Sequence, residues 1–445
     1  MKISVIGTGY VGLVSGACFA EVGHDVICVD KDEDKVKRIN QRQSPIYEEG
    51  LEEILHRQIG NRLKASTNLP QAIQQTDVTF IAVGTPYNGE EIDLRQIEEV
   101  SRSIGEALQT KTKHHLIVVK STVVPGTTEN VIVKLIEKYS KKQVGESISV
   151  GMNPEFLREG VAVQDFMSPD RIVIGCSDEK GREIFRSLYS VFPETDIVHT
   201  SNTAAEMIKY TSNSLLATLI SFSSEIANLC SKIGGIDAMD VMHGVHLDKR
   251  ISPIVNGKRV TPGIVLYLEG GCGFGGSCFP KDVKALVAYG RKNNQKMDVL
   301  SSVVEVNKLQ PMVLVDKLKF FLPNLQHKTI AILGLAFKPG TDDVRESPAL
   351  TIIKSLKQQG AKVVAFDPKA TEMTQREIPA SSQIIYAKSL EEAVLPADAV
   401  LLVTSWPEFR KVERLVSQYE LDPIIVDGRR FWNHGFVSRF DGIGM

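Results

Sequence analysis

Residues 2–30, KISVIGTGYVGLVSGACFAEVGHDVICVD, decide how the first part of the chain folds. A short apolar run leads into closely spaced glycines, an apolar Ala-rich stretch extends to Val22, and a second apolar run ends at Asp30. This pattern predicts a strand, a glycine-rich turn, a helix and a second strand. A strand–helix–strand unit of this kind builds a parallel sheet.

The glycines of this segment have a spacing that is typical of a dinucleotide site. Gly7, Gly9 and Gly12 form GxGxxG between a predicted strand and a predicted helix, where the backbone approaches a pyrophosphate closely. Asp30 ends the next strand, where a carboxylate accepts hydrogen bonds from a ribose 2′-hydroxyl and repels a 2′-phosphate. The segment therefore predicts NAD rather than NADP. The alternative is a tight turn that binds nothing.

The same alternation continues along the first 200 residues. Apolar runs that begin at Asp77, His115 and Ser147 predict three more strands, separated by helical patterns. Residues 1–200 are therefore expected to form an NAD-binding Rossmann domain with a mostly parallel, doubly wound sheet.

The middle of the chain has a different pattern. Residues 202–233 contain neither Pro nor Gly, and their apolar residues recur at three- and four-residue steps, which predicts one long, largely buried helix. More helix is expected over 281–317, interrupted near Gly290 and Pro311. Residues 201–315 are thus predicted to form a helical middle domain. Because its central helix is too apolar to stand alone, we expect it to pair two chains in a homodimer or a higher homo-oligomer.

The last third repeats the first. KTIAILGLAFKPG (328–340), GAKVVAFDPK (360–369), ADAVLLVTSWPE (397–408) and DPIIVDGRR (422–430) match the strands and turns of the first domain in the same order. This predicts a second Rossmann-like domain over 316–445. It lacks the glycine pattern, so its ligand is not expected to be a second dinucleotide. The predicted fold is α/β, with two Rossmann-like doubly wound domains joined by a helical middle domain, and a cleft where two ligands meet.

Composition limits the functional classes. The 445 residues carry a formal charge of −2 with no long basic run, which argues against nucleic acid or an anionic membrane as the main partner. The six cysteines are scattered without zinc spacing, which argues against a metal and favours a reducing cytoplasm. No apolar run has the roughly eighteen residues of a membrane span. A secretory signal at the N-terminus is not favoured, because cleavage would remove a strand.

The loop GGCGFGGSCFPKD, residues 270–282, points most clearly to chemistry. Pro280 suits the start of a helix, so Cys278 is expected just before a helix N-terminus. The helix dipole and Lys281 would both favour a thiolate, and Asp282, four residues on, could serve as a base. The alternative is a buried free cysteine with an ordinary first-turn acid.

Further candidates lie at predicted element ends. Asn153-Pro154-Glu155 is predicted to begin a helix that places Glu155 and Glu159 on one face. Lys209 and Asn213 share one face of the long middle helix, which makes both candidates for the site. The alternative is that Lys209 is an ordinary solvated lysine. Ser121-Thr122 and Thr85-Pro86 end two strands, where simple turn chemistry is the alternative.

Cations follow the strands of the second α/β domain. Lys338 and Arg345 lie in the loop after its first strand, and Arg429-Arg430 follow its last predicted strand. These are positions from which cations would hold a diphosphate. The histidines have no partners at triad or metal spacing, and no role is assigned to them.

Taken together, the motifs resemble those of the UDP-glucose 6-dehydrogenase group of nucleotide-sugar dehydrogenases over essentially the whole chain. The motifs that carry the resemblance are GTGYVG, VGTP, KSTVVPGT, NPEFLREG, AEMIKYTSN, GFGGSCFPKD, FKPGTDDVRES and DGRR. The resemblance implies that UDP-glucose, two NAD and water give UDP-glucuronate and two NADH.

The resemblance also implies roles for individual residues. Cys278 would form a thiohemiacetal and then a thioester, Lys209 and Asn213 would stabilise oxyanions, and Asp282, Glu155 and Thr122 would handle water and protons. The implied cofactor contacts are Gly7, Gly9, Tyr10, Val11, Gly12, Asp30, Lys35, Thr85, Thr122, Glu159 and Arg345. The implied substrate contacts are Phe156, Leu157, Glu159, Lys209, Asn213, Arg250, Tyr267, Glu269, Gly273, Phe274, Gly275, Phe337, Lys338 and Arg429.

One stretch departs from the family pattern. The family places an arginine that reaches the neighbouring subunit's substrate shortly before the cysteine loop, but here residues 251–272 separate Arg250 from Gly273. Either Arg250 or Arg259 could take that role. UDP-N-acetylmannosamine, GDP-mannose and UDP-galactose therefore stay open as alternative substrates. A two-electron hydroxyacid dehydrogenase and a non-catalytic NAD-binding protein are the rival functional classes.

Overall fold

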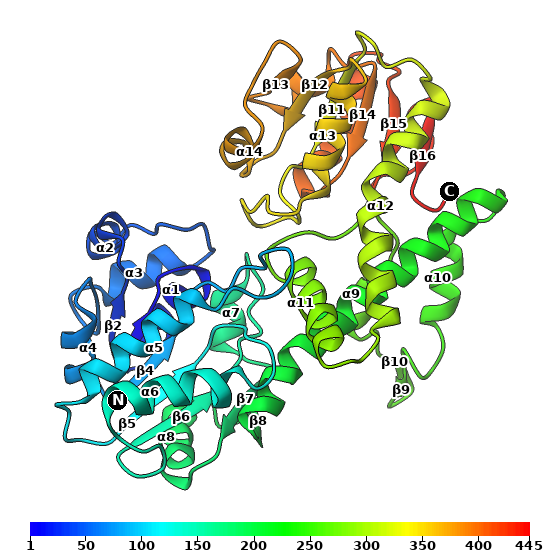
Figure 1. Ribbon diagram of the computed structural model, residues 1–445. Helices are drawn as coiled ribbons and strands as arrows, with labels where there is room; N and C mark the ends of the chain where they lie inside the picture. Colours follow the sequence, from blue (N-terminus) through cyan, green and yellow to red (C-terminus); the bar gives the residue numbers. More distant parts are fainter. The chain divides into compact units, whose positions relative to one another are not determined.

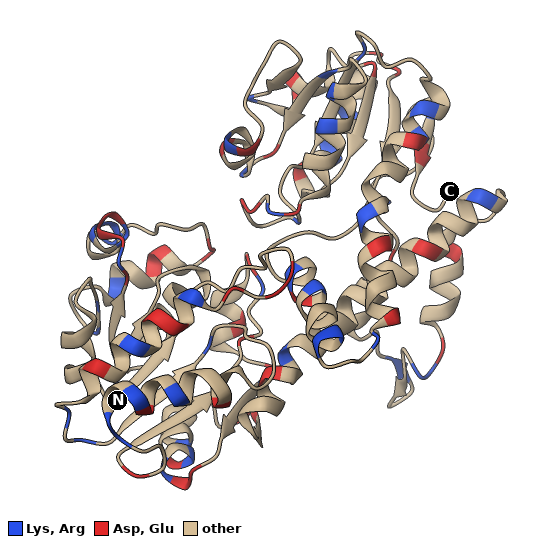
Figure 2. Cartoon of the chain, viewed as in Figure 1, with Lys and Arg blue, Asp and Glu red and all other residues tan.

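The computed structural model describes residues 1–445, which form two compact units, 1–212 and 213–445. Helix α9 (Asn202–Ile233) is continuous and contributes residues to both units (Figure 1). Lys and Arg are interspersed with Asp and Glu on the helices of both units (Figure 2). No helix has the length and apolar character needed to cross a membrane.

Unit 1 is built on one eight-stranded sheet in the order β3-β2-β1-β4-β5-β6-β7-β8. All neighbouring strands are parallel except β6 and β7. Ile3 of β1 pairs with Val26 of β2 on one side and with Val78 of β4 on the other, so the strand order reverses at β1. The strands are β1 (Lys2–Ile6), β2 (Asp25–Val29), β3 (Leu63–Ser66), β4 (Val78–Ile81), β5 (His115–Val119), β6 (Ile148–Met152), β7 (Arg171–Cys176) and β8 (Asp196–Thr200).

Helices cover both faces of this sheet and create two cores. Leu13, Phe19 and Phe166 belong to the core beneath α1, α3 and α7, whereas Ile104 and Ile136 belong to the core beneath α4, α5 and α6. The helices are α1 (Tyr10–Glu21), α2 (Glu33–Asn40), α3 (Leu51–Gln58), α4 (Leu69–Gln75), α5 (Arg95–Leu108), η1 (Thr128–Val133), α6 (Lys134–Ser140), α7 (Ala162–Met167) and α8 (Glu179–Tyr189). Two covered faces explain why the strands read as continuous apolar runs.

Unit 2 contains a six-stranded, fully parallel sheet in the order β13-β12-β11-β14-β15-β16. This order repeats β3-β2-β1-β4-β5-β6 of unit 1, so the predicted second Rossmann-like domain is confirmed. The strands are β11 (Thr329–Leu333), β12 (Lys362–Phe366), β13 (Ile384–Tyr386), β14 (Ala399–Leu402), β15 (Ile424–Asp427) and β16 (Phe440–Gly442). The helices are α13 (Pro348–Gln358), α14 (Thr371–Glu377), α15 (Leu390–Val394), η3 (Pro407–Arg410) and α16 (Lys411–Gln418).

The segment between the two sheets is helical, as predicted. It comprises α9, α10 (Ala238–His246), a small hairpin of β9 (Ile254–Val255) and β10 (Lys258–Arg259), η2 (Gly263–Tyr267), α11 (Phe279–Lys292) and α12 (Asp298–Phe321). The helix break predicted near Gly290 occurs just after Lys292. The break predicted at Pro311 is wrong, because Pro311 lies inside α12. Pro311 is itself buried, and the following residues Leu314 and Leu318 pack into the core of unit 2, which holds the helix together across the proline.

Helix α9 has the predicted bounds, but the prediction that it is largely buried is wrong along one of its faces. Leu215, Phe222 and Leu229 are 51%, 52% and 55% exposed. They are seven residues apart, so they form one apolar stripe along the helix, which we call the α9 stripe.

Candidate functional site

The glycine-rich turn of unit 1 depends on close backbone approaches. Gly7 has φ +98°, and a Cβ there would lie 2.6 Å from the carbonyl oxygen of Ala82. A Cβ on Gly12 would lie 1.9 Å from the carbonyl oxygen of Gly7. Gly9, the N-cap of α1, is different, because nothing lies within 4 Å of the place a Cβ would occupy and no side chain caps the helix. The amino end of α1 is thus open to a phosphate.

Asp30 lies beside this turn and is held in place by it. One carboxylate oxygen accepts hydrogen bonds from the backbone N–H of Thr8 at 2.8 Å and from its hydroxyl at 2.6 Å. Burial opposes ionisation of Asp30, but the hydrogen bonds from Thr8 outweigh it and lower the pKa of the carboxyl. Asp30 is therefore an anionic acceptor, as a ribose-binding role requires.

A tie that no sequence motif indicates joins the turn to the segment after β6. The Tyr10 hydroxyl donates to Glu48, and Glu48 also accepts from the backbone N–H groups of Gly160 at 2.7 Å and Ala162 at 2.6 Å. Burial, followed by the bond to Glu48, raises the pKa of Tyr10. Glu48 lies in the run YEEGLEE, whose several acids gave no reason to single it out.

The strand-end residues of β4 and β5 lie together. The Thr85 hydroxyl donates to the carbonyl oxygen of Thr122 at 2.7 Å, and the Ser121 hydroxyl donates to that of Val83 at 2.7 Å. The carboxyl edge of the sheet therefore gathers both predicted strand-end positions beside the glycine-rich turn.

The prediction of a helix beginning at Asn153-Pro154-Glu155 is wrong. Residues 153–161 are irregular and α7 begins only at Ala162, so Glu155 and Glu159 do not share a helical face. The Asn153 side chain acts in tertiary contacts instead of capping a helix, since its amide donates to the carbonyl oxygen of Val173 at 2.8 Å. The Glu155 carboxylate accepts from the backbone N–H of Leu157 at 2.6 Å, which closes a local turn.

This turn presents Glu155 to α9. Lys209 Nζ lies 3.0 Å from Glu155 Oε1, and both side chains are almost completely buried. Lys209 also lies over the Phe156 ring, with Nζ 5.4 Å from the ring centre. The structure thus brings together three residues predicted for the site.

A buried second lysine was not predicted. Lys120 Nζ donates to the side-chain oxygen of Asn153 at 2.9 Å. Burial lowers the pKa of Lys120 to about 8, while Glu155 opposes and Lys209 reinforces this shift. In sequence Lys120 is one lysine at the end of an apolar run, with nothing to mark it as buried.

Glu206 holds the loop that carries Thr122. It accepts from the backbone N–H groups of Gly126 at 2.5 Å and Thr128 at 2.7 Å, and from the Thr128 hydroxyl at 2.6 Å. Burial raises the pKa of Glu206 to about 7, although these hydrogen bonds oppose the shift. The first turns of α9 therefore position two parts of the unit 1 site. Glu206 binds the loop after β5, and Lys209 binds Glu155.

In unit 2, Cys278 is the N-cap of α11, as predicted, and no side chain caps that helix. Cys278 is partly exposed, whereas the other five cysteines are buried, and none of the six forms a disulfide. Its sulfur lies 3.5 Å from the Ser277 hydroxyl oxygen. A sulfur at an uncapped helix N-terminus has the electrostatic setting that favours a thiolate.

Asp282, one turn into α11, is buried, and each of its two carboxylate oxygens has a partner. The Asn213 amide donates to one carboxylate oxygen at 2.6 Å, and Lys281 Nζ lies 2.5 Å from the other. Lys281 thus shares its charge with Asp282 and does not act on Cys278 alone. Asn213 of α9 and Asp282 of α11 are brought together, as a shared site requires.

The glycine loop before Cys278 packs against the second α/β domain. Arg429 donates to the carbonyl oxygens of Gly273 at 3.0 Å and Val403 at 2.7 Å. A Cβ on Gly275 would lie 2.4 Å from the carbonyl oxygen of Glu346. A Cβ on Gly276 would meet the Phe337 ring at 2.8 Å. The loop glycines therefore permit contact with two elements that carry predicted substrate residues.

Other predicted substrate residues lie near this loop. The Tyr267 ring packs on that of Phe279, with 6.3 Å between ring centres, and Lys338 Nζ lies 5.8 Å from the Phe337 ring centre. Burial raises the pKa of Glu269, although His246 opposes this.

Several predicted cations are engaged elsewhere. Arg430 forms an ion pair of 2.6 Å with Asp237, and Arg345 forms one of 2.7 Å with Asp343. Arg250 pairs with Asp248, yet its side chain is 89% exposed. Arg259 donates to the carbonyl oxygens of Leu247 and Ser252. Arg259 therefore supports the local loop, while Arg250 extends from the surface of the chain.

The second α/β domain repeats the turn geometry of the first but closes it. Gly334 has φ +91° and occupies the position of Gly7, since each donates its N–H to the last residue of the next strand. Asp367 occupies the position of Asp30, but it accepts from Leu335, Ala336 and Trp406 and is buried. The two aspartates therefore differ in exposure, since Asp367 is enclosed within its own domain whereas Asp30 is only partly buried.

Three family models match consecutive parts of the chain. Residues 1–193 match the NAD binding domain of the UDP-glucose/GDP-mannose dehydrogenase family, residues 203–309 its central domain and residues 331–434 its UDP binding domain.

Individual relatives cover nearly the whole chain. UDP-glucose 6-dehydrogenase AglM of Haloferax volcanii is 42% identical over 448 residues, covering 100% of this chain and 99% of that protein. UDP-glucose 6-dehydrogenase TuaD of Bacillus subtilis is 41% identical over 440 residues, covering 97% and 90%. The solved UDP-glucose dehydrogenase of Pyrobaculum islandicum has a TM-score of 0.89 and 36% identity, covering 99% and 97%.

Proposed function

Because the chain belongs to the UDP-glucose/GDP-mannose dehydrogenase family, we propose that it oxidises the C6 alcohol of UDP-glucose to a carboxylate with two molecules of NAD. The single observation that carries the proposal is the sulfur of Cys278 at the uncapped N-terminus of α11, one helical turn from the buried Asp282–Asn213 pair. A dehydrogenase that stops at the aldehyde needs no such nucleophile.

The residues of unit 1 fit NAD. The open amino end of α1 at Gly9 suits a pyrophosphate, and the anionic Asp30 suits an unsubstituted ribose. When bound, NAD supplies the acceptor for the hydride. Lys35 and Thr85 are proposed to line the same site, together with Tyr10, Val11, Thr122 and Glu159. Arg345, which the resemblance implies as a further cofactor contact, belongs to unit 2.

The proposed chemistry on Cys278 accounts for both oxidations. After the first hydride and a proton leave the alcohol, the Cys278 sulfur bonds to the aldehyde carbon and the oxygen takes up a proton. Loss of a second hydride and proton gives a thioester. Water then adds to the thioester carbon, the C–S bond breaks, and the carboxylate and the thiol are released. The covalent adduct retains the aldehyde between the two oxidations.

Five further residues are proposed to stabilise developing charge and to transfer protons. Lys209 and the Asn213 amide are proposed as donors to the oxyanions, since preorganised donors at a buried site lower the barrier. Asp282, Glu155 and Thr122 are proposed to position water and to move protons. Glu155 is suited to this because its ion pair with Lys209 keeps a carboxylate in a buried position.

Unit 2 is proposed to hold the UDP-sugar. The glycine loop, Phe337, Lys338 and Arg429 form one connected surface, and the family model that matches residues 331–434 describes a UDP binding domain. Phe156, Leu157, Glu159, Arg250, Tyr267, Glu269 and Phe274 are proposed as further substrate contacts. The proposed domains are 1–200 for NAD, 201–315 for dimerisation and 316–445 for the UDP-sugar.

The α9 stripe supports a homodimer or a higher homo-oligomer. Three large apolar side chains at heptad spacing are suited to contact with the same helix of a second copy. Phe222→Glu should shift the mass measured by light scattering toward the monomer. The six cysteines, none of which forms a disulfide, support a cytoplasmic location.

One experiment tests substrate and reaction class together. The protein is incubated with NAD and each of UDP-glucose, UDP-galactose, UDP-N-acetylmannosamine and GDP-mannose, and NADH formed per sugar is counted. The proposal expects two NADH with UDP-glucose and little turnover of the others. A solved UDP-D-ManNAc dehydrogenase of Pyrococcus horikoshii has a TM-score of 0.84 and 28% identity, so turnover of the N-acetyl sugar is the informative competing result. One NADH per sugar would contradict the four-electron reaction.

A further inference from the structure

The amino-terminal edge of the unit 1 sheet contains a hollow of about 790 Å³. Five neighbouring strands, β3-β2-β1-β4-β5, begin at this edge, and residues at or just before their first positions line the hollow. The glycine-rich turn follows the last residue of β1, at the opposite edge of the same sheet. The hollow is therefore separate from the proposed NAD site.

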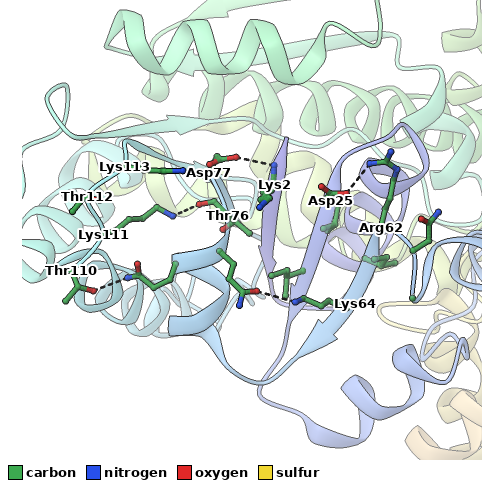
Figure 3. Close-up of a pocket in the computed structure, with 17 residues that line it drawn as sticks. Lys2, Asp25, Arg62, Lys64, Thr76, Asp77, Thr110, Lys111, Thr112 and Lys113 are labelled. Atoms are coloured by element: carbon green, nitrogen blue, oxygen red, sulfur yellow. Dashed lines mark hydrogen bonds and ion pairs between the residues drawn. The ribbon is translucent and has the colours of Figure 1, made fainter.

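The hollow has an excess of positive charge. Five cationic side chains line it against two carboxylates, an excess of three, whereas the whole chain has a net charge of −2. The cations are Lys2, Arg62, Lys64, Lys111 and Lys113, and the carboxylates are Asp25 and Asp77 (Figure 3). An anion that enters the hollow gains from this local field.

Two of the five cations, Lys111 and Arg62, interact with carbonyl or carboxylate oxygens of the fold. Lys111 Nζ donates to the carbonyl oxygens of Ile73 and Thr76 at the end of α4, and Arg62 pairs with Asp25 at 3.1 Å.

Three lysines lack a carboxylate partner. Lys64 Nζ donates to the neutral amide oxygen of Gln75 at 3.2 Å, and the ammonium groups of Lys2 and Lys113 form neither an ion pair nor a hydrogen bond. These are the cations available to a ligand.

The lowered pKa of Lys111 agrees with an excess of positive charge in the hollow. Burial lowers its pKa, and repulsion from Lys113 and Lys142 lowers it further, although Asp77 opposes the shift. Lys142 lies nearby, since its Nζ donates to the carbonyl oxygen of Lys111. An anion beside Lys113 would relieve this repulsion.

We propose that this hollow binds a small polyanion with two or more linked phosphate groups. The neutral lining combines amide and hydroxyl side chains with Val26, Ile27, Gly60 and Leu63 and contains no aromatic ring, so it offers hydrogen bonds to phosphate oxygens but no aromatic surface for stacking a base. The neutral polar side chains are Asn61, Gln74, Gln75, Thr76, Thr110 and Thr112. A single phosphate would leave most of the volume to water. The site recognises the phosphate chain, whether it is free or carried by a nucleotide.

The competing explanation is that these cations only neutralise the carboxyl ends of α1, α4 and α5, which end just before β2, β4 and β5. Lys111 does so at α4. This explanation predicts that no phosphate compound binds here.

Calorimetric titration with tripolyphosphate separates the two explanations. The full-length protein is first saturated with NAD and UDP, so that the proposed catalytic sites cannot take the probe. Lys64→Gln/Lys113→Gln is compared with the wild type and with a control, Lys134→Gln/Lys138→Gln, which removes the same charge from lysines of α6 outside the hollow. The rate of NADH formation, expected to be unchanged in both variants, checks that each is folded.

We expect saturable binding to the wild type and the control, and a Kd at least about tenfold higher in the pocket variant, since each lysine supplies a charge-assisted contact. ATP should bind about as tightly as tripolyphosphate, and raising the salt concentration well above the physiological range should weaken both. Absence of saturable wild-type binding, equal Kd values in all three proteins, or much tighter binding of ATP than of tripolyphosphate would each overturn the proposal.

Discussion

Lys209 of α9 and Glu155 of the turn after β6 form an ion pair of 3.0 Å, with side chains only 4% and 5% exposed. A buried pair contributes little net stability, but losing one partner leaves the other charge unpaired at full desolvation cost. The pair therefore anchors the start of α9 to the segment that carries Glu155 and Phe156. It also holds together a cation and a carboxylate that are both proposed to act in the reaction.

Lys209→Met should lower the free energy of unfolding by about 3–5 kcal/mol, because it leaves the Glu155 carboxylate buried without its cation. Urea denaturation monitored by circular dichroism measures this loss. Lys209→Met/Glu155→Gln is the matched control and should recover much of it, since neither residue is then charged. A double variant no more stable than the single one would contradict the account.

Asn213→Ala should reduce kcat by about a hundredfold, because it removes a proposed oxyanion donor and the partner of Asp282. Asn228→Ala on the same helix removes a comparable bond, that of the Asn228 amide to Gln310 at 2.9 Å. Steady-state rates and thermal melting of both variants separate the effects. Both should lose some stability, and only Asn213→Ala should lose kcat. Equal rates in the two variants would remove Asn213 from the proposed site.

Glu206 should give stability a measurable pH dependence. Its pKa is raised from 4.5 to about 7 by burial, so the folded state binds a proton more tightly than the unfolded state. Stability should therefore fall as pH rises from about 4.5 to about 7, by up to about 3 kcal/mol from this group. Urea midpoints of the wild type and Glu206→Gln across this range test this. The variant should lack that part of the slope, and identical slopes would contradict the shift.

Glu48→Gln should loosen the segment before α7, because one of the backbone N–H groups of Gly160 and Ala162 would then face an amide N–H. The expected loss is about 1–3 kcal/mol of local stability. Amide hydrogen exchange at these two residues reports it directly. Tyr10→Phe, which keeps both backbone bonds to Glu48, should exchange more slowly than Glu48→Gln. Faster exchange in Tyr10→Phe would assign the tie to the tyrosine.

Periodicity and repetition predicted the fold well because they reflect local rules. The strand-turn-helix of residues 2–30, the bounds of α9 and the repeat that pairs Gly7 with Gly334 follow from patterns within a few residues. The sequence predictions are wrong where contacts between residues distant in sequence determine the local structure. Asn153 looks like a helix cap, yet its side chain is taken up by Lys120 and by β7, and Pro311 looks like a helix break, yet core packing holds α12 through it.

The site residues that the sequence does not predict also depend on contacts with distant parts of the chain. Cys278 is recognisable because the loop and the helix start lie beside it in sequence. Glu48, Lys120 and Glu206 act on backbone or side chains 33 to 114 residues away. Lys120 and Glu206 lie within KSTVVPGT and AEMIKYTSN, but those motifs drew attention to other residues, and Glu48 lies in none of the motifs. Their roles depend on burial, which a single charged residue does not reveal in sequence.

The proposed role of the Cys278 sulfur is to hold the substrate between two oxidations. Its most direct test is to mix Cys278→Ser with UDP-glucose and NAD and to measure UDP-glucuronate and NADH over time, beside the wild type and a Cys230→Ser control, whose sulfur is buried. We predict two NADH per UDP-glucuronate in the wild type and the control, and a loss of carboxylate formation of at least about a thousandfold in Cys278→Ser. Carboxylate formation by Cys278→Ser at the wild-type rate would contradict the account.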